Sequence, residues 1–498
     1  MTQPPLLMGI DLGTSSVKTV IISPDGNVHS IATYEYSVIT PQPGWAEQNP
    51  EIWFNAAAQT AWQALHKTGI PAEAIVGIGL CGLMHGTVFL NKQGSTPRPA
   101  IIWADQRSFL QVERIIQTIG IEKLGEWTGN PLATGFMLPT WLWIKENEPE
   151  IAQTTAQLLL PKDYLRYRLT GNYGSEPSDA ASTSLFNPAQ RKWSNEILQS
   201  FKIDPVLLPP IHPSAEVAGE LTQDFASITG LKVGIPVVYG GSDQACQALG
   251  HGVIEPGVIS CTIGTGGQLF APTLTPTYDT QLRLHMFCHV LPGHWHLEAA
   301  TLSAGLSLKW LRDHIFERRN YQQLADLAVL IPPGSEGLYF IPYLVGERTP
   351  HMDPQAKAGF LGLTLRHERS HLVRAVMEGV VYSLKQGLDL MLSMGIPVDR
   401  VIASGGATAH PLWLQLQADI FDRPIYRTTT LEAAAVGAAM LAGVAVGIYP
   451  DAQSACREVV KIQDQVVTTI QQNRDRYAEM YPTYCQIYPT MRKIFHLQ

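Results

Sequence analysis

A short pattern that occurs twice, about half a chain apart, is the feature that most constrains the fold. Near the N-terminus, an apolar run at residues 6–10 leads into a turn that contains Gly13-Thr14. Midway through the chain, the apolar run at residues 258–263 leads into Gly264-Thr265 in the same way. A strand that ends in a Gly/Thr turn, and that restarts at mid-chain, is typical of a duplicated domain.

The length of the chain supports this interpretation. Its 498 residues exceed the roughly 250–300 residues at which a single hydrophobic core stops growing. A hydrophobic content of 45% with only 16% charged residues is typical of a well-buried folded protein. We therefore expect one domain over residues 1–252 and a second over 253–498, with a hinge near residues 250–257, which contain three glycines and a proline.

Apolar patterning predicts strands and helices in both halves, and hence an α/β fold class. The predicted elements of the first half are strands at 6–10, 17–23, 28–36, 74–80 and 87–90 and a helix at 50–65. Those of the second half are strands at 258–263, 268–271 and 400–403 and a long helix at 367–394.

Composition excludes some classes of partner. The net charge of −8 argues against nucleic acid, because phosphate backbones attract clustered Lys and Arg. The longest uncharged apolar stretch, residues 433–450, is shorter than the roughly 20 residues of a membrane span, so we expect a buried helix there and no membrane partner. The six cysteines form no C-x-x-C pair, which favours reduced thiols and a cytoplasmic location.

The first turn carries groups that suit a phosphate. Asp11 ends a strand, and the N–H groups and hydroxyls of Thr14 and Ser15 follow, with Lys18 nearby as a cation. Such a turn can face phosphate oxygens while the carboxylate reaches a phosphate-bound Mg²⁺. The alternative is a simple hairpin turn. The second turn at Gly264-Thr265 favours the phosphate interpretation, because two such turns could grip one triphosphate from opposite sides.

Asp243 is the candidate for a catalytic base. It follows a double glycine, Gly240-Gly241, and Ser242, at the point where a predicted strand gives way to a helix. Asp and Ser are both favoured helix caps, so a structural role for Asp243 is a strong alternative. A cap needs only one of them, however, and the glycines suggest close approach by a ligand. A carboxylate there could accept a hydroxyl proton during phosphoryl transfer.

Met84 and His85 lie between two glycines, Gly82 and Gly86, which would let them project into a cavity. A lone histidine is more often a structural residue, and that alternative stays open. Further along, a predicted strand leads into Gly405-Gly406 and then a helix, an arrangement that can hold a nucleotide.

Two other patterns are weaker. Residues 77–82 match the G-x-G-x-x-G dinucleotide fingerprint, but the helix that should follow is absent from the sequence pattern. His285 and His289 have the i, i+4 spacing of a zinc site on a helix, yet Pro292-Gly293 and the neighbouring aromatic residues favour paired strands. We expect neither a dinucleotide nor a zinc site.

Taken together, these motifs resemble the FGGY family of carbohydrate kinases over residues 8–448, and most closely its xylulokinases. The segments that carry the resemblance are 43–48, 84–86, 98–103, 161–164, 240–243, 346–350, 378–379 and 405–407. The resemblance implies two actin-like, ribonuclease H-like domains, each a mixed sheet flanked by helices, with an interdomain cleft. The first domain would hold the sugar and the base, and the second would hold the nucleotide.

The resemblance also implies roles for single residues. Asp243 would be the base, Asp11 would help to hold Mg²⁺ with ATP, and Met84, His85 and Gln244 would contact the sugar. The residues expected at ATP are Thr14, Ser15, Lys18, Gly264, Thr265, Gly305, Lys309, Gly405, Gly406 and His410. His410 stands where relatives often have Asn.

The expected reaction is phosphorylation of D-xylulose to D-xylulose 5-phosphate. Met84-His85 and Gly135 differ from the pattern of glycerol kinases, whereas gluconokinases share Met-His and remain an alternative, as does another ketose or polyol kinase. From other classes, a non-kinase actin-like ATPase and a catalytically silent sugar sensor remain open. A homodimer is possible.

Overall fold

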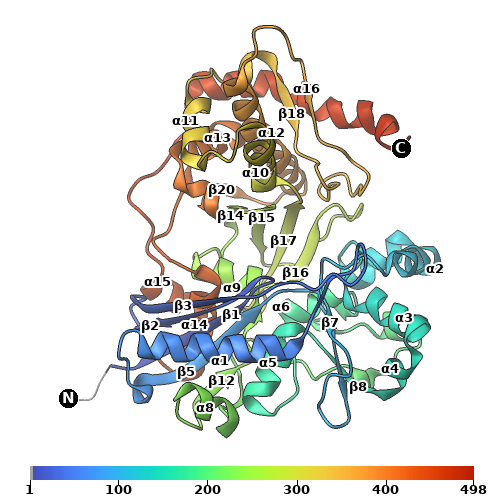
Figure 1. Cartoon of the computed structure of the whole chain (residues 1–498), viewed down its shortest axis with the longest axis vertical. Coiled ribbons are helices and arrows are strands. Elements are labelled where there is room, and N and C mark those ends of the chain that lie inside the picture. Colours follow the sequence, from blue (N-terminus) through green and yellow to red (C-terminus); the bar gives the residue numbers. More distant parts are fainter. Residues whose placement is uncertain (1–3, 498) are drawn as a thin grey trace.

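The computed structural model describes residues 4–497, which form two α/β lobes, each built around a mixed sheet (Figure 1). The first sheet has the order β11-β12-β5-β1-β2-β3, with β13 beside β5. Its strands are β1 Leu6–Leu12, β2 Ser16–Ile22, β3 Val28–Glu35, β5 Ile75–Gly82, β11 Val217–Glu220, β12 Pro236–Val238 and β13 Gly241–Ser242. The second sheet has the order β16-β17-β15-β14-β20-β21, with β14 Gly257–Ile263, β15 Gly267–Thr273, β16 His285–Cys288, β17 Trp295–Thr301, β20 Val398–Ser404 and β21 Ile425–Tyr426.

The two sheets repeat one topology. In the first, β1, β2 and β3 pair antiparallel, while β5 and β12 continue from β1 in parallel. In the second, β14, β15 and β17 pair antiparallel, while β20 and β21 continue from β14 in parallel. Each strand in this set thus has a counterpart in the other lobe. The duplication inferred from the two Gly/Thr turns is confirmed, since both turns join the first two strands of their sheets.

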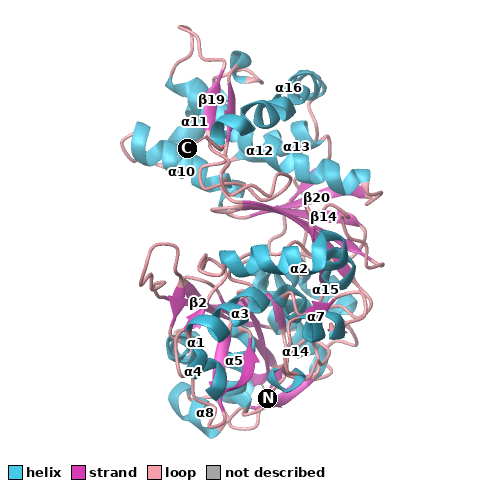
Figure 2. Ribbon diagram, turned by 90° about the vertical axis from the view of Figure 1, so that its right-hand side faces the viewer, coloured by secondary structure: helices cyan, strands magenta, loops and turns pink. Residues whose placement is uncertain are grey.

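Helices flank both sheets (Figure 2). Those of the first half are α1 Pro50–His66, α2 Phe109–Thr128, α3 Met137–Asn147, α4 Pro149–Thr154, α5 Pro161–Thr170, α6 Pro177–Ala180, α7 Asn195–Ser200, α8 Gln223–Thr229 and α9 Asp243–Gly250. Those of the second half are α10 Ala304–Ile315, α11 Tyr321–Val329, α12 Arg369–Ser393, α13 Pro411–Phe421, α14 Ala433–Ala445, α15 Ala452–Val459 and α16 Gln471–Phe495. The helices predicted at 50–65 and 367–394 are confirmed as α1 and α12.

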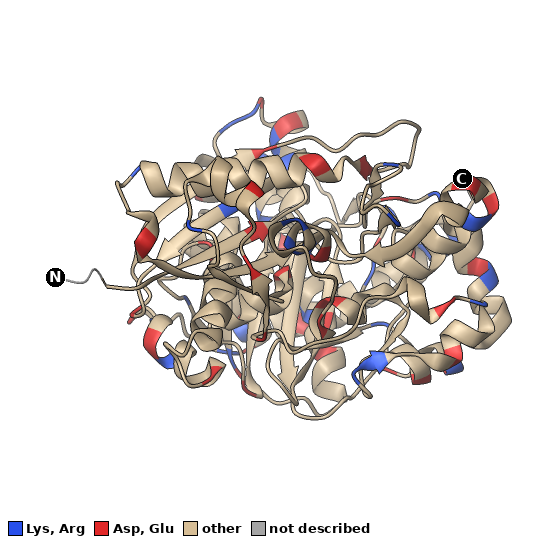
Figure 3. Cartoon of the chain, turned by 90° about the horizontal axis from the view of Figure 1, so that it is seen from below, with Lys and Arg blue, Asp and Glu red and all other residues tan. Residues whose placement is uncertain are grey.

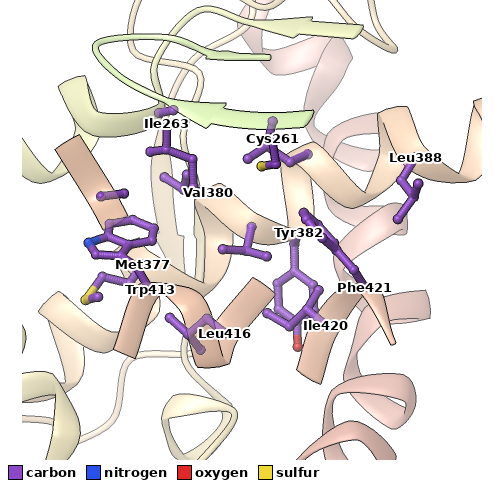
Figure 4. Close-up of a cluster of buried hydrophobic side chains, with 14 of the residues drawn as sticks. Cys261, Ile263, Met377, Val380, Tyr382, Leu388, Trp413, Leu416, Ile420 and Phe421 are labelled. Carbon is purple, nitrogen blue, oxygen red and sulfur yellow. The ribbon is translucent and has the colours of Figure 1, made fainter. Parts of the chain in front are cut away.

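Local sequence explains where these helices begin and which face they bury. Asn49 caps α1 by accepting a hydrogen bond from the Glu51 N–H at 3.0 Å, and Pro50 occupies the first helical position, where no N–H is needed. In the second lobe, α12 packs against β15, β17 and α13. Figure 4 shows this core, in which Cys261, Met377 and Trp413 come from β14, α12 and α13 respectively.

The Ala- and Gly-rich stretch predicted as a buried helix forms α14, which packs in the first lobe although it belongs to the second half of the sequence. It lies against β1 and β5, in which glycines make room for it. A Cβ atom on Gly9 would lie 1.8 Å from the carbonyl oxygen of Ala435, and one on Gly79 would lie 1.8 Å from that of Ala438. Gly77 and Gly79, two of the three glycines that imitate a dinucleotide fingerprint, therefore face α14, and Gly79 is needed for its close packing.

The position of α14 qualifies the predicted division at 252–253. The boundary stays a prediction, and it divides the chain by sequence only. In space, α14 and α15 come from the second half of the sequence but pack in the first lobe (Figure 1). Acidic and basic residues are interspersed along the outer elements, as Figure 3 shows. No helix within residues 4–497 is both long and apolar enough to cross a membrane.

Candidate active site

The strand register brings Asp11 next to the start of α9. Asp11 on β1 pairs with Cys81 on β5, and Cys81 pairs with Gly241 on β13. Asp243 follows two residues later as the first residue of α9. The two carboxylates therefore share the carboxyl edge of three parallel strands, which is where ligands bind in open α/β sheets. The Cys81 thiol donates a long hydrogen bond of 3.5 Å to Asp11 Oδ1.

The two carboxylates repel each other in a poorly solvated place. Burial raises the pKa of Asp243 to about 8, and the negative charges of Asp11 and Glu298 contribute to the rise. Burial likewise raises the pKa of Asp11 to about 6, although Cys81 and the cation of Lys18 oppose it. Strongly shifted carboxyl groups in one recess are typical of a functional site.

The helix-cap alternative is resolved in favour of Ser242. Its hydroxyl accepts from the Ala245 N–H at 3.4 Å and caps α9, while Asp243 Oδ1 accepts only from the N–H of its neighbour Gln244, at 2.7 Å. The inference from the double glycine was wrong in part. Gly240 has φ 79°, and a Cβ there would lie 1.9 Å from the Leu80 carbonyl oxygen, so β5 and not a ligand requires this glycine.

Contacts with neighbouring residues fix the His85 ring and leave its Nε2 atom available to a ligand. Its backbone has φ 72°, its N–H donates to Ser182 Oγ at 3.1 Å, and its ring stacks on Phe136 with centroids 4.0 Å apart. Nδ1 lies 2.8 Å from the Ser182 carbonyl oxygen, which can only accept, so Nδ1 carries the proton. Burial lowers the pKa of His85 to about 3, which keeps the ring neutral and leaves Nε2 as an acceptor.

The strand β16 of the second lobe lies beside Met84 and His85. Met84 belongs to a buried cluster that includes Phe287, and the Phe287 ring lies 6.0 Å from the His85 ring. The predicted sugar-binding segment is thus enclosed by both halves of the chain. Gln244 follows Asp243 on α9 and is partly exposed. His285 lies on the strand β16, so the helical i, i+4 spacing on which the zinc alternative rested does not occur there.

The second Gly/Thr turn is assembled with the start of α10 and the end of β20. The Gly305 N–H donates to the Gly264 carbonyl at 2.9 Å, and a Cβ on Gly305 would lie 2.3 Å from that oxygen. Gly405 has φ 82° and lies against Ile263, whereas a Cβ on Gly406 would meet open space. Thr265 is exposed at the tip of this turn. These predicted nucleotide residues lie together.

The first turn is a hairpin between β1 and β2, as the structural alternative proposed, and its shape is also fixed from outside. Trp103 Nε1 donates to Thr14 Oγ1 at 2.9 Å, and Gln48 Nε2 donates to the Thr14 carbonyl at 2.7 Å. The Thr14 hydroxyl keeps its own proton for donation, and Ser15 is exposed beside it. A preformed turn with free donors is compatible with phosphate binding.

Three other predicted nucleotide residues make contacts elsewhere. Lys18 Nζ pairs with Glu432 at 2.6 Å, and Lys309 Nζ pairs with Asp313 at 2.6 Å on the exposed side of α10. His410 caps α13 by accepting from the Leu412 N–H at 3.1 Å. Their contacts with ATP stay predictions, and each would require a contact beyond those that the structure shows.

The residues that sequence reasoning missed are Ser182, Phe136, Glu298 and Arg348. Ser182, in the short 3-10 helix Ala181–Thr183, and Phe136, in a loop, contact His85 from far away in sequence, so no local pattern could have found them. Arg348 lies within the 346–350 segment that carried the resemblance, but no role was assigned to it. For Glu298, the sequence offered only the alternation of polar and apolar residues that is typical of a strand.

The carboxylates of Asp11 and Asp243 suit a divalent cation that is bound together with phosphate. Asp11 is partly exposed, and it and Asp243 are two negative charges whose repulsion a cation would relieve. With no third protein ligand in the described chain, such an ion would take most of its ligands from phosphate and water. Mg²⁺ prefers that coordination.

A duplicated α/β fold with two Gly/Thr turns and a pair of carboxylates at the carboxyl edge of the sheet defines a phosphotransferase of two lobes. Residues 6–250 match the N-terminal domain of the FGGY family of carbohydrate kinases, and residues 259–446 match its C-terminal domain. The chain belongs to this family and is a carbohydrate kinase.

Individual relatives agree with this family assignment. A xylulose kinase of Staphylococcus epidermidis is 36% identical over 98% of this chain and 97% of its own length. A gluconokinase of Bacillus subtilis is 31% identical over 89% of this chain and 88% of its own. The crystal structure of a xylulose kinase from Rhodospirillum rubrum is 27% identical, with a TM-score of 0.91, and the match covers 99% of this chain and all of that one.

Proposed function

We propose that the chain transfers the terminal phosphoryl group of ATP to D-xylulose, giving D-xylulose 5-phosphate and ADP, with Mg²⁺ as the metal. One observation carries the chemistry: the strand register places Asp243 beside Asp11, while Ser242 takes over the capping of α9. The xylulose kinases among the relatives, at 36% identity against 31% for the gluconokinase, support the sugar. A cytoplasmic location and a homodimer remain predictions.

The mechanism follows from the chemistry of these side chains. Asp243 accepts the proton of the sugar's terminal hydroxyl as that oxygen bonds to the phosphoryl group. The raised pKa of Asp243, caused first by burial and then by Asp11, favours the protonated carboxyl that results. His85 Nε2 accepts a hydrogen bond from another hydroxyl and so orients the sugar. Mg²⁺, held by Asp11, would neutralise charge on the phosphates.

The two Gly/Thr turns act on the nucleotide. N–H groups and hydroxyls of Thr14 and Thr265, which are at least partly exposed, would donate to phosphate oxygens, on which negative charge concentrates during transfer. Apolar walls from both lobes, Met84 and Phe287 among them, exclude water that would otherwise compete as the acceptor.

A panel of sugars tests the substrate. ADP formation is measured with D-xylulose, D-ribulose, gluconate and glycerol at saturating Mg·ATP. We expect D-xylulose to have the highest kcat/KM. A higher kcat/KM for gluconate would overturn the sugar assignment but leave the kinase chemistry intact, whereas ATP hydrolysis that ignores every sugar would contradict the kinase mechanism.

The shifted pKa of Asp243 predicts the pH dependence. A base must be ionised, so kcat/KM for the sugar should fall as the pH drops through the pKa of Asp243. Since burial raises that pKa to about 8, and a bound cation lowers it, we expect an ascending limb between about pH 6 and 8. A pH profile of kcat/KM measures the limb. A profile that stays flat down to pH 5 would contradict an Asp243 with a raised pKa.

A further inference from the structure

The C-terminal lobe turns a polar face toward the sugar-binding segment, and the mechanism above does not use it. On β16 and β17, His285 lies opposite Glu298. Their neighbours Met286 and Leu297 point into the core of the lobe, so His285 and Glu298 project from the other face of the sheet. Phe287 shares that face and reaches the His85 ring, which shows that the face lies toward the first lobe.

Arg348 is anchored beside this face. The Thr349 N–H donates to the Ala300 carbonyl at 3.0 Å, and Glu347 Oε1 accepts from the N–H groups of Leu302 and Arg348 at 3.0 and 2.7 Å. These bonds fix the backbone of Arg348 against the end of β17. Within residues 4–497, its guanidinium forms no hydrogen bond and no ion pair, although the side chain is largely enclosed.

The charge of Arg348 acts on three neighbouring side chains. Burial is the main cause of the lowered pKa of His85 and of His285, and the charge of Arg348 adds to both shifts. Burial also raises the pKa of Glu298 to about 7, and Arg348 opposes that rise. The groups that act on Asp243 are instead Asp11 and Glu298. These shifts agree with the backbone hydrogen bonds, which hold Arg348 at the end of β17 beside the face that carries His285 and Glu298.

Glu298 is the second incompletely bonded group. Its Oε1 accepts from Gln268 Nε2 at 3.2 Å, while Oε2 is buried and has no partner among the described residues. Glu298 and Arg348 interact electrostatically without forming an ion pair. An unpaired buried polar group is unfavourable, so a ligand that offers both donors and acceptors would be stabilised between them.

We propose that Arg348 and Glu298 bind hydroxyl groups of the sugar on its His85 side and determine which sugars the enzyme accepts. The guanidinium donates to sugar oxygens and the carboxylate accepts from sugar hydroxyls. Because Glu298 adds a negative charge beside Arg348, the site favours a neutral ketose over an aldonate, whose carboxylate Glu298 repels. The inference rests on the proposed function, since it assumes that a neutral sugar is the substrate.

Glu298→Gln tests the charge without changing the shape. We expect this variant to raise the ratio of kcat/KM for gluconate to that for D-xylulose at least 10-fold, because the repulsion is gone while Arg348 remains. Arg348→Met should lower kcat/KM for D-xylulose by about 10–100-fold, mainly through KM, because it removes hydrogen bonds made throughout the reaction. The KM for ATP should stay unchanged in both.

Arg366→Met, at an exposed Arg with a partner at 3.4 Å, is the charge-matched control and should leave both sugars unaffected. Thermal unfolding of each variant shows whether it folds. An unchanged sugar ratio in Glu298→Gln, or a loss in Arg348→Met that lies wholly in kcat and is equal for all sugars, would overturn the proposal. Failure of the unaltered enzyme to phosphorylate D-xylulose would contradict the proposed function itself, and this outcome is distinguishable from a failure of the variants.

Discussion

Asp243→Asn is expected to lower kcat by about 10²–10⁴-fold while ATP still binds, because the amide keeps the shape of the carboxylate but cannot accept the sugar's proton. The substitution should not unfold the protein. Ser242 caps α9, and Asp243 accepts only the N–H of Gln244, which an amide oxygen can also accept. Removing one of two repelling carboxylates should leave the thermal midpoint equal to or above that of the unaltered chain.

The measurement combines kcat with D-xylulose, ATP affinity by calorimetry and thermal unfolding. Ser242→Ala is the matched control, because it removes the cap and leaves the carboxylate. It should cost about 1 kcal/mol in stability and change kcat far less than Asp243→Asn does. Near-normal turnover in Asp243→Asn, or an equal loss in Ser242→Ala, would show that residue 243 serves the helix and not the chemistry.

The sequence was sufficient for features that depend on neighbours along the chain. Alternation and turn residues located β1, β2 and β3, and the repeated Gly/Thr turn predicted a duplicated fold. The choice between Asp243 and Ser242 as the cap was not decidable in the same way. Both residues are good caps, and only the hydrogen bond from Ala245 to Ser242 separates them.

Features that depend on distant contacts escaped prediction. Lys18 has the right position beside the first turn, but its partner Glu432 lies 414 residues away in sequence. The glycines of β5 were recognised as a false dinucleotide fingerprint, yet the helix that requires Gly79 comes from the other half of the chain. Arg348 lies beside the end of β17 because Thr349 and Glu347 form hydrogen bonds to Ala300 and Leu302, which are about 45 residues away in sequence.

Gly79→Ala should destabilise the protein by about 3 kcal/mol or more, because the new methyl group would meet the backbone of α14 and not a mobile side chain. Its Cβ would lie 1.8 Å from the Ala438 carbonyl oxygen. Gly77→Ala, on the same face of β5, is the matched control. There a Cβ would lie 3.1 Å from Val446 Cγ1, the end of a side chain that can move, so the cost should stay within about 1 kcal/mol.

Urea unfolding of both variants measures the difference, and sugar-dependent ADP formation shows whether it reaches the site. Glu432, which pairs with Lys18 on β2 opposite Asp11, immediately precedes α14. A displaced α14 should therefore also lower kcat in Gly79→Ala, whereas Gly77→Ala should keep it. Equal stability of the two variants would mean that α14 can shift freely over β5. In that case, the close contact between α14 and β5 would not hold the second half of the chain on the first lobe.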